Sequence, residues 1–371
     1  MSIQKKNGKY VPIIYLGKDP LTNKKIYKWG SYHDKKKDAE KEHAHMILDK
    51  ENQKNFNIFK DITLGQLAEK HFELIAPKKY ANSTIDGYIG YYKKHIYPIF
   101  DSRPIKNIET IHVQKFLLTK TELSPATQRK IYYLLKIILD SGVKWNMIKI
   151  NPCKGVELPE VKRNKNRTVW TPEQVNSFLS NKQVMSSKYY IMLTLSFTLG
   201  LRPGEVCGLT WDDINKDYLT ISNGLDKKKR ETNLKNSSSQ RKLYIDESTY
   251  KNLQTQKIWQ SSNKLLFGKL YIINNLVFTN ENGTPISPDT YGKEFKKLIT
   301  CSKLDIPIIS LYGARHTFAS NAIAYGLEPS VVANIMGHST ITTTYDNYVH
   351  VQSDPIKEAT TTMHNLFYRR I

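Results

Sequence analysis

The sequence has few cysteines and no long apolar run. Cys153, Cys207 and Cys301 lie far apart and form no C-x-x-C pair, which argues against a disulfide framework and a thiolate zinc site. A reducing cytoplasm is therefore the expected location. The most apolar stretch, residues 189–201, is too short to span a membrane and predicts a core helix. Residues 1–10 contain no apolar segment of the kind that a secretory signal peptide needs.

Two common catalytic motifs are also missing. A phosphate-binding loop needs Ser or Thr after its Gly-Lys pair, but Gly292-Lys293 is followed by Glu294, so nucleotide hydrolysis is not indicated. His43 and His45 are two positions apart on a charged segment, so they would not share a helical face. A metal role for them is not expected. We therefore expect neither a metal nor another cofactor.

Positive charge, in contrast, is abundant. The chain of 371 residues has 56 Lys and Arg against 34 Asp and Glu, a net charge of +22. Such an excess concerns partners and not the fold. It indicates a polyanionic partner, and nucleic acid is the commonest one. The alternative is a basic protein whose charges only solvate its surface.

The length favours two or three domains, and residues 1–57 form the first. Residues 10–15 and 25–29 predict strands because they are rich in aromatic and β-branched side chains, and residues 35–49 predict a charged helix. The domain has thirteen Lys and seven acidic residues, a net charge of +6. Aromatic side chains among lysines on a small sheet suit DNA contact. The alternative is a sheet edge that lysines protect from aggregation.

Residues 58–158 predict an all-helical second domain. Thr63 opens one helix, Asn82 or Ser83 a second, and Ser124-Pro125 a third. The third helix has an apolar stripe that predicts core packing. The stripe consists of Ile131, Leu134, Leu135, Ile138 and Leu139.

A polar linker, residues 159–167, separates this domain from a third domain at 168–371. Four cations of the linker are candidates for contact with DNA phosphates. They are Lys162, Arg163, Lys165 and Arg167. The third domain opens with a capping box at residues 171–174, which has Pro172 at the first helical position.

The third domain contains four spaced signals. In the first, residues 199–211, an apolar helix ends at Gly200 and another begins at Pro203, with Arg202 between them. Glu205 is its predicted buried partner, and this pair could also serve only to hold the turn.

The second signal is a pair of predicted strands at 218–222 and 242–245. Between them lies a basic segment that could enter a DNA groove, although most of its charges could equally solvate the hairpin or touch phosphates. Its cations are Lys227, Lys228, Lys229, Arg230, Lys235 and Arg241.

The third and fourth signals are two helix ends. Ser310 can cap a helix that carries Tyr312 and Arg315 three positions apart, hence on one face. Gly337 closes a later helix and presents His338 at its C-terminal end, where a cationic imidazole is favoured. Residues 345–350 follow and contain two tyrosines.

In this order and spacing the four signals resemble the tyrosine recombinase (phage integrase) family. Its pattern is an Arg in a G-L-R-x-x-E elbow, a Lys on a hairpin, H-x-x-R-H-T-F-A, G-H-S, and a Tyr often followed by x-H. The resemblance covers the third domain in full and the other two loosely. It implies a multidomain, mainly α protein with small β-sheets. The expected parts are an arm-type DNA-binding sheet-plus-helix domain, an all-helical core-binding domain and an α+β catalytic domain.

The resemblance also assigns residue roles. It makes Arg202 and Arg315 the phosphate-binding arginines, Lys235 the hairpin lysine, His338 the histidine of G-H-S and Tyr348 the nucleophile. The only nearby competitor of that nucleophile is Tyr345.

One position departs from the family pattern, because Tyr312 stands where a histidine is usual. A phenol can donate a hydrogen bond to phosphate, but with an ordinary pKa of about 10 it shuttles protons poorly at pH 7. The assignment of acid and base chemistry to this position therefore stays open.

The implied activity is site-specific cleavage and rejoining of DNA through a 3′-phosphotyrosine, which integrates and excises a mobile element or prophage. The implied partners are double-stranded DNA attachment sites and three further copies of the chain, a tetramer on two duplexes. The implied location is the bacterial cytoplasm, at the nucleoid and away from the membrane. The sequence leaves open whether an excisionase and a host DNA-bending protein take part. It also leaves two rivals, a type IB topoisomerase-like enzyme and a DNA-binding protein with a decayed site.

Overall fold

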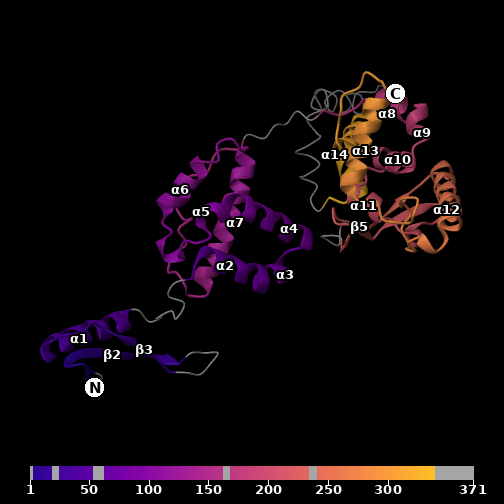
Figure 1. The fold of residues 1–371 in the computed structure, drawn as a ribbon. Coiled ribbons are helices and arrows are strands. Elements are labelled where there is room, and N and C mark those ends of the chain that lie inside the picture. Colours follow the sequence, from indigo (N-terminus) through magenta and orange to yellow (C-terminus); the bar gives the residue numbers. More distant parts are fainter. Residues whose placement is uncertain (1–2, 19–24, 53–61, 162–167, 234–239, 339–371) are drawn as a thin grey trace, which may run out of the picture. The chain divides into compact units, whose positions relative to one another are not determined.

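The structure is a computed structural model that describes residues 3–18, 25–52, 62–161, 168–233 and 240–338 (Figure 1). The chain divides into two compact units, residues 1–162 and 163–371. Both are mainly helical with small sheets, which confirms the predicted fold class. None of the described helices is both long and apolar enough to cross a bilayer.

The N-terminal part of the first unit is a three-stranded antiparallel sheet followed by one helix. The strands β1 (Ile3–Lys6), β2 (Lys9–Lys18) and β3 (Lys25–Trp29) lie in that order, and α1 (Lys36–Asn52) packs on β2. Strand β1 was not predicted. It turns into β2 through Asn7 and Gly8, which both have positive φ angles, 53° and 79°, as a tight hairpin turn requires.

The rest of the first unit is helical, as predicted. Its elements are α2 (Leu64–Lys70), η1 (His71–Ile75), α3 (Ala76–Lys79), α4 (Asn82–Tyr91), η2 (Tyr92–Ile96), α5 (Tyr97–Phe100), η3 (Ile105–Asn107), α6 (Thr110–Leu118) and α7 (Pro125–Lys144). The η1 and η2 segments are π-helical, and each runs into a short helix with Pro77 or Pro98 near its start. A proline has no N–H to donate to the carbonyl four residues earlier. In the wider π-helical turn that carbonyl can accept from the next N–H along the chain, so fewer backbone groups are left unpaired.

The predicted helix starts are largely confirmed. Thr63 forms a capping box with Gln66, and the Ser124 side chain accepts the Thr127 N–H. Helix α4 begins at Asn82 as expected, but its N-cap is Ala81, which has no polar side chain. The five residues of the α7 stripe are all at most 1% exposed and belong to the core of this unit.

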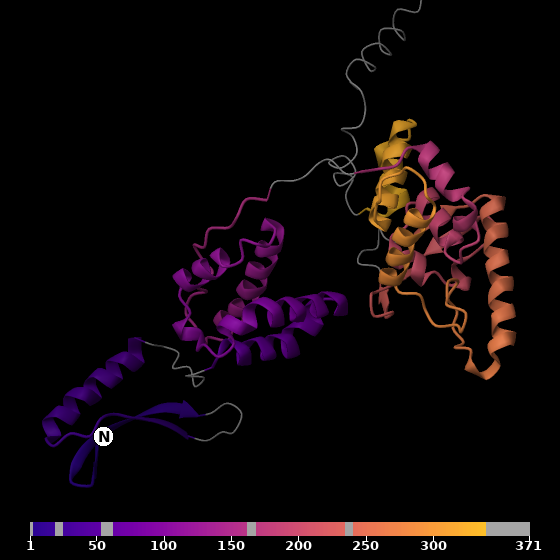
Figure 2. The same cartoon turned by 45° about the horizontal axis from the view of Figure 1, so that its top comes forward.

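The second unit contains helices around one core, with two small sheets. Its elements are α8 (Pro172–Leu179), α9 (Lys182–Met185), α10 (Tyr190–Thr198), α11 (Pro203–Gly208), η4 (Trp211–Asp213), β4 (Tyr218–Ile221), β5 (Asn223–Leu225), β6 (Glu231–Asn233), β7 (Arg241–Tyr244), α12 (Glu247–Phe267), η6 (Gly268–Leu270), α13 (Pro288–Cys301), α14 (Leu311–Ala324) and α15 (Pro329–Met336). Helix α12 runs along one edge of the unit in both views (Figure 1 and Figure 2).

The core of this unit is aromatic. The ring of Trp170 stacks on Phe197 with centroids 5.3 Å apart and also contacts Phe178 and Phe295. Its indole N–H donates to the Pro307 carbonyl at 2.8 Å, so the buried ring leaves no polar atom unpaired. This packing confirms α10, predicted from the apolar stretch, as a core helix.

The strands of one small sheet are inserted in the sequence between the two strands of the other. The predicted pair of strands is confirmed as β4 and β7, which are antiparallel with Ile221 opposite Arg241. Between them the chain forms a second hairpin, β5–β6, which was not predicted. Helix α11 approaches β5 so closely that a Cβ at Gly208 would lie 2.6 Å from the Gly224 Cα, which fixes α11 against this hairpin.

We expect Leu135→Ala to lower the free energy of unfolding of the helical part of the first unit by about 2–5 kcal/mol, because the side chain is fully buried and its removal leaves a cavity. Leu118→Ala is the matched control, since Leu118 is 63% exposed, and should change it by less than about 0.5 kcal/mol. Native-state hydrogen exchange at α7 amides measures both. Equal effects of the two variants would contradict the described core.

Candidate active site

The first signal forms the predicted elbow between α10 and α11. Gly200 has a φ of 59°, and a Cβ there would lie 2.5 Å from the Phe318 ring, so only glycine fits the turn. Arg202 follows in extended conformation as the N-cap of α11. Its backbone N–H donates to Glu205 Oε2 at 2.9 Å, and its Nη1 donates to Glu205 Oε1 at 2.6 Å. The Arg202 side chain is 32% exposed and that of Glu205 only 3%, so the predicted buried partner is confirmed.

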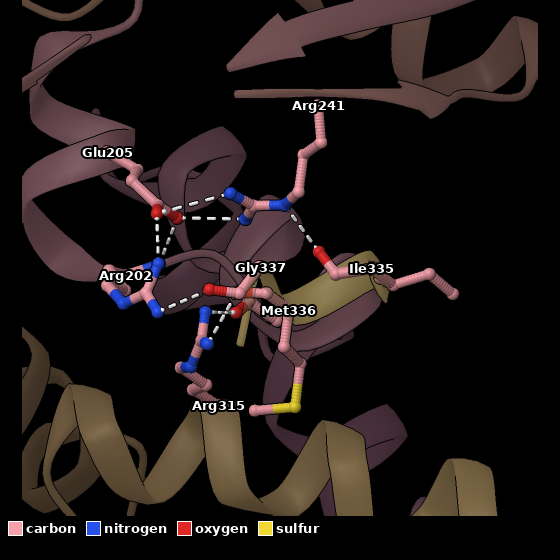
Figure 3. Close-up of polar contacts among 8 residues, drawn as sticks. Arg202, Glu205, Arg241, Arg315, Ile335, Met336 and Gly337 are labelled. Atoms are coloured by element: carbon pink, nitrogen blue, oxygen red, sulfur yellow. Dashed lines mark hydrogen bonds and ion pairs between the residues drawn. The ribbon is translucent and has the colours of Figure 1, made fainter. Parts of the chain in front are cut away.

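The C-terminal end of α15 is the point at which the other signals meet. Gly337 caps this helix in the left-handed conformation, with φ 64°. The last carbonyls of a helix have no N–H partner within the helix and carry partial negative charge. Here three successive carbonyls each accept a hydrogen bond from a different arginine (Figure 3). The pairs are Arg241 Nε with Ile335 O at 2.6 Å, Arg315 Nη2 with Met336 O at 2.6 Å, and Arg202 Nη2 with Gly337 O at 2.9 Å.

Arg315 joins this helix end to the elbow. Its Nη1 donates to the Gly200 carbonyl at 2.7 Å while its Nη2 donates to Met336, and the residue is only 3% exposed. A planar guanidinium presents its donors in fixed directions, so two backbone acceptors from different elements determine its orientation. The third and fourth signals are therefore held against the first.

One carboxylate serves two of the three arginines. Burial alone would raise the pKa of Glu205, but hydrogen bonds and charge from Arg241, followed by the charge of Arg202, hold that pKa below its ordinary value. Glu205 is therefore ionised at neutral pH. Three guanidiniums and one carboxylate leave the cluster with an excess of positive charge, and a phosphate group carries the complementary charge.

The protonation state of His338 differs from the one that the sequence predicted. We expected the end of α15 to favour the imidazolium, but burial lowers the pKa of His338 to about 4, with further contributions from Arg315, Arg202, His316 and Arg241. The dipole of an eight-residue helix is a smaller effect than desolvation next to several cations. The imidazole is thus neutral at pH 7.

Tyr312 and Arg315 lie on the same helix, as expected, but they differ in exposure. They are one turn apart on α14, but Tyr312 is 57% exposed and Arg315 is buried. Within the described ranges, no hydrogen bond joins the Tyr312 hydroxyl to the arginine cluster. Tyr312 is thus available to a bound partner and is not part of the buried network.

The hairpin cations divide into two groups. Lys227, Lys228, Lys229 and Arg230 lie at the β5–β6 turn, where Arg230 forms an ion pair with Asp226 and the Lys227 side chain is 79% exposed. Arg241, which the sequence analysis grouped with these DNA-contacting cations, is 7% exposed and bound to Glu205 and Ile335. Sequence reasoning missed this pairing because Arg241 and Glu205 are 36 positions apart.

Several expected site residues lie outside the described residues. They are Lys162, Arg163, Lys165, Arg167, Lys235, Tyr345 and Tyr348. Within the part of the chain that the structure describes, His, Cys, Asp and Glu side chains form no group of three that could hold a metal ion.

We expect Gly337→Ala to be more destabilising than Gly326→Ala. Both glycines have positive φ angles, 64° and 87°, which cost an alanine about 1–2 kcal/mol. An added Cβ at Gly337 would also lie 2.8 Å from Arg241 Nη1, whereas at Gly326 it would meet nothing within 4 Å. Thermal unfolding of the two variants measures the difference. Equal losses would mean that Arg241 does not pack against this turn.

Two segments of the chain match models of one known family. Residues 168–354 match the phage integrase family, and residues 63–120 match the N-terminal SAM-like domain of phage integrases. A tyrosine recombinase XerC-like protein of Caldanaerobacter subterraneus subsp. tengcongensis is 26% identical over 98% of both chains. The ICEBs1 integrase of Bacillus subtilis is 27% identical over 96% of this chain and 98% of its own.

Solved structures share the fold. An integrase of the Tn1549 transposon, in complex with transposon right end DNA, aligns with a TM-score of 0.66 at 24% identity, over 82% of this chain and 99% of its own. A lambda integrase tetramer bound to a Holliday junction aligns with a TM-score of 0.61 at 15% identity, over 95% of this chain and 96% of its own. Because the model of the phage integrase family matches residues 168–354, half of the chain, the chain belongs to this family.

Proposed function

We propose that this chain is a site-specific integrase that cuts and rejoins DNA through a 3′-phosphotyrosyl bond to Tyr348, and so integrates and excises a mobile element or prophage. The observation that carries this proposal is the arginine cluster at the end of α15, in which Arg202 is partly exposed and Arg315 is fixed by two backbone carbonyls. Enzymes of this family use a tyrosine nucleophile.

The cluster suits the chemistry of a phosphodiester. The substrate is an anion, and attack at phosphorus places more negative charge on its non-bridging oxygens. Guanidiniums neutralise this charge with planar donors and stay protonated at any working pH. Because Arg202 and Arg315 are already oriented by Glu205 and by backbone carbonyls, little reorganisation is needed when the phosphate binds.

The proton transfers follow from the remaining residues. The phenol of Tyr348 attacks phosphorus and loses its proton to a base. His338 is the proposed acceptor once the bound phosphate anion offsets the cations that lower the pKa of its imidazole. A bond from phosphorus to the phenolic oxygen forms and the bond to the 5′-oxygen breaks, with Lys235 as the proposed donor of a proton to that oxygen. Attack by a 5′-hydroxyl of a second duplex reverses the step, so no nucleotide is consumed. Tyr312 is proposed to donate a hydrogen bond to the phosphate.

The three domains are proposed to bind DNA in different ways. Residues 1–57 would bind arm-type sites, 58–158 the core site, and 168–371 would carry catalysis, with linker 159–167. The sheet of the first domain supports this, because Tyr27 and Trp29 are 48% and 49% exposed and the Lys6 ammonium lies 5.7 Å from the centroid of the Trp29 ring. The linker cations and those of the β5–β6 turn are proposed to contact phosphates.

The assembly is proposed to be a homotetramer on two duplexes, since a lambda integrase tetramer of the same fold is bound to a Holliday junction. An excisionase and a host DNA-bending protein are proposed as further partners. The expected place of action is the nucleoid in the bacterial cytoplasm. Residues 354–371 are proposed to dock on a neighbouring copy, with packing on their own domain as the alternative.

A suicide substrate with a nick near the crossover site tests the proposed function. We expect a covalent adduct that maps to Tyr348, no adduct with Tyr348→Phe, and DNA binding by this variant within about twofold of wild type, because only one oxygen is removed. Tyr345→Phe is the matched control and should form the adduct normally. Absence of any wild-type adduct would favour a non-catalytic DNA-binding protein. Relaxation of supercoils without strand exchange would favour a topoisomerase-like enzyme.

A deletion of residues 1–57 tests the role of the first domain. The remaining chain should still cleave a core site but recombine full attachment sites poorly. The deleted domain, with its net charge of +6, would no longer be present to bind arm sites. Footprinting of the full chain and of residues 58–371 on the same attachment DNA shows the difference. Identical footprints would disprove a separate arm-site function.

A further inference from the structure

Arg241 occupies a position that the proposed chemistry does not use. It is the first residue of β7, opposite Ile221, yet its side chain leaves the sheet and enters the arginine cluster, where it is 7% exposed. In Figure 3 it approaches Glu205 and Ile335 from the side opposite to Arg315. Its guanidinium faces Glu205 and the Ile335 carbonyl, and the proposed chemistry gives it no contact with the phosphate.

Three of its nitrogens have defined acceptors. Nη2 donates to Glu205 Oε2 at 3.0 Å, Nη1 contacts Oε1 at 3.3 Å, and Nε donates to the Ile335 carbonyl at 2.6 Å. The first two contacts form a fork on the carboxylate, and the third points to the end of α15. The guanidinium thus links three elements, β7, α11 and α15.

Gly337 shows how closely the turn before His338 fits this side chain. A Cβ at that position would lie 2.8 Å from Arg241 Nη1, so the turn and the guanidinium are packed in direct contact. A displaced Arg241 would therefore disturb the Gly337 carbonyl that accepts from Arg202. The effect of Arg241 reaches Arg202 by this route and through Glu205.

The geometry points to Arg241 as a positioning residue for the cleavage step: it holds Glu205 and the end of α15 so that Arg202 and His338 are oriented before DNA binds. This role rests on the proposed function, because it concerns the phosphate chemistry assigned to those residues. Lysine cannot replace it, since an ammonium group lacks the planar fork that reaches both carboxylate oxygens and the Ile335 carbonyl.

The charge of Glu205 provides a second line of argument. Burial raises its pKa, and the hydrogen bonds and charge of Arg241 are the main opposing contribution, ahead of Arg202. Without Arg241 the carboxyl group would gain a proton at a higher pH than in the wild type. Once protonated, Glu205 would attract Arg202 less strongly, so cleavage should fall on the acid side of the pH profile. The other groups that lower the pKa of His338, namely Arg315, Arg202 and His316, would remain in place.

Arg241→Gln and Arg241→Lys test this role in the full-length protein, with Lys242→Gln as control. Lys242 is the next residue on β7 and lies over the Tyr218 ring, so the control removes one positive charge from the same strand outside the cluster. We expect both Arg241 variants to bind attachment DNA within about twofold of wild type with an unchanged salt slope. Their single-turnover cleavage at saturating DNA should fall about 100-fold, the loss expected from a misplacement of about 1 Å. Lys242→Gln should cleave at the wild-type rate.

The pH profile and a double variant complete the test. The acid limb of the Arg241→Gln profile should lie at higher pH than that of wild type. Glu205→Gln combined with Arg241→Gln should lose little beyond Glu205→Gln alone, because both changes act on one unit. Should Arg241→Gln fail to fold, as thermal unfolding would show, Arg241→Lys decides the matter because it keeps a cation opposite Glu205.

Two results would overturn the inference. Wild-type cleavage by both Arg241 variants would show that the contact has no role in positioning. A loss of affinity equal to the loss of cleavage, with a salt slope shallower by about one, would make Arg241 a phosphate contact. The affinity and the salt slope do not depend on catalysis, so they decide between a positioning residue and a DNA contact even if wild type forms no adduct. The absence of a wild-type adduct would reject the proposed function separately.

Discussion

The C-terminal end of α15 is a set of backbone acceptors that the helix itself cannot use. Its last carbonyls point beyond the final turn, and guanidiniums from the elbow, from α14 and from β7 fill the three positions. Each arginine comes from a different element, so the helix end is the common point through which these elements are held in register. The left-handed turn at Gly337 makes this possible because it ends the helix and leaves its last carbonyls accessible.

Three like charges at one helix end would repel one another without compensation. The buried carboxylate of Glu205 provides the compensating negative charge, and each of its oxygens accepts from both Arg202 and Arg241. The neutral state of His338 belongs to the same balance, since a fourth cation in this environment would be unfavourable. The site is therefore ordered by internal charge pairing and still keeps excess positive charge for an anionic ligand.

Local signals in the sequence predicted much of this. The capping residues Thr63, Ser124 and Thr171, the stripe on α7 and the elbow at Gly200 depend on nearby residues, and the structure confirms them. The hairpin turn at Asn7-Gly8 is an equally local signal, although β1 was not predicted from it. Within the site, the two predictions that failed depended on distant contacts. The burial of Arg241 and the neutrality of His338 both result from side chains brought together by folding, and no spacing pattern encodes them.

The choice of acceptors has a consequence for how the site tolerates sequence change. Arg202, Arg241 and Arg315 bind the carbonyls of Gly200, Ile335, Met336 and Gly337, which are main-chain atoms present in every residue type. The hydrogen bonds themselves therefore do not depend on the side chains at Ile335 and Met336, although Met336 is fully buried and must stay apolar to fill the core. The two glycines with positive φ angles and the charged side chains are constrained more tightly, by residue type. In an architecture of this kind the orientation of the three guanidiniums depends on the path of the main chain more than on the side chains around it.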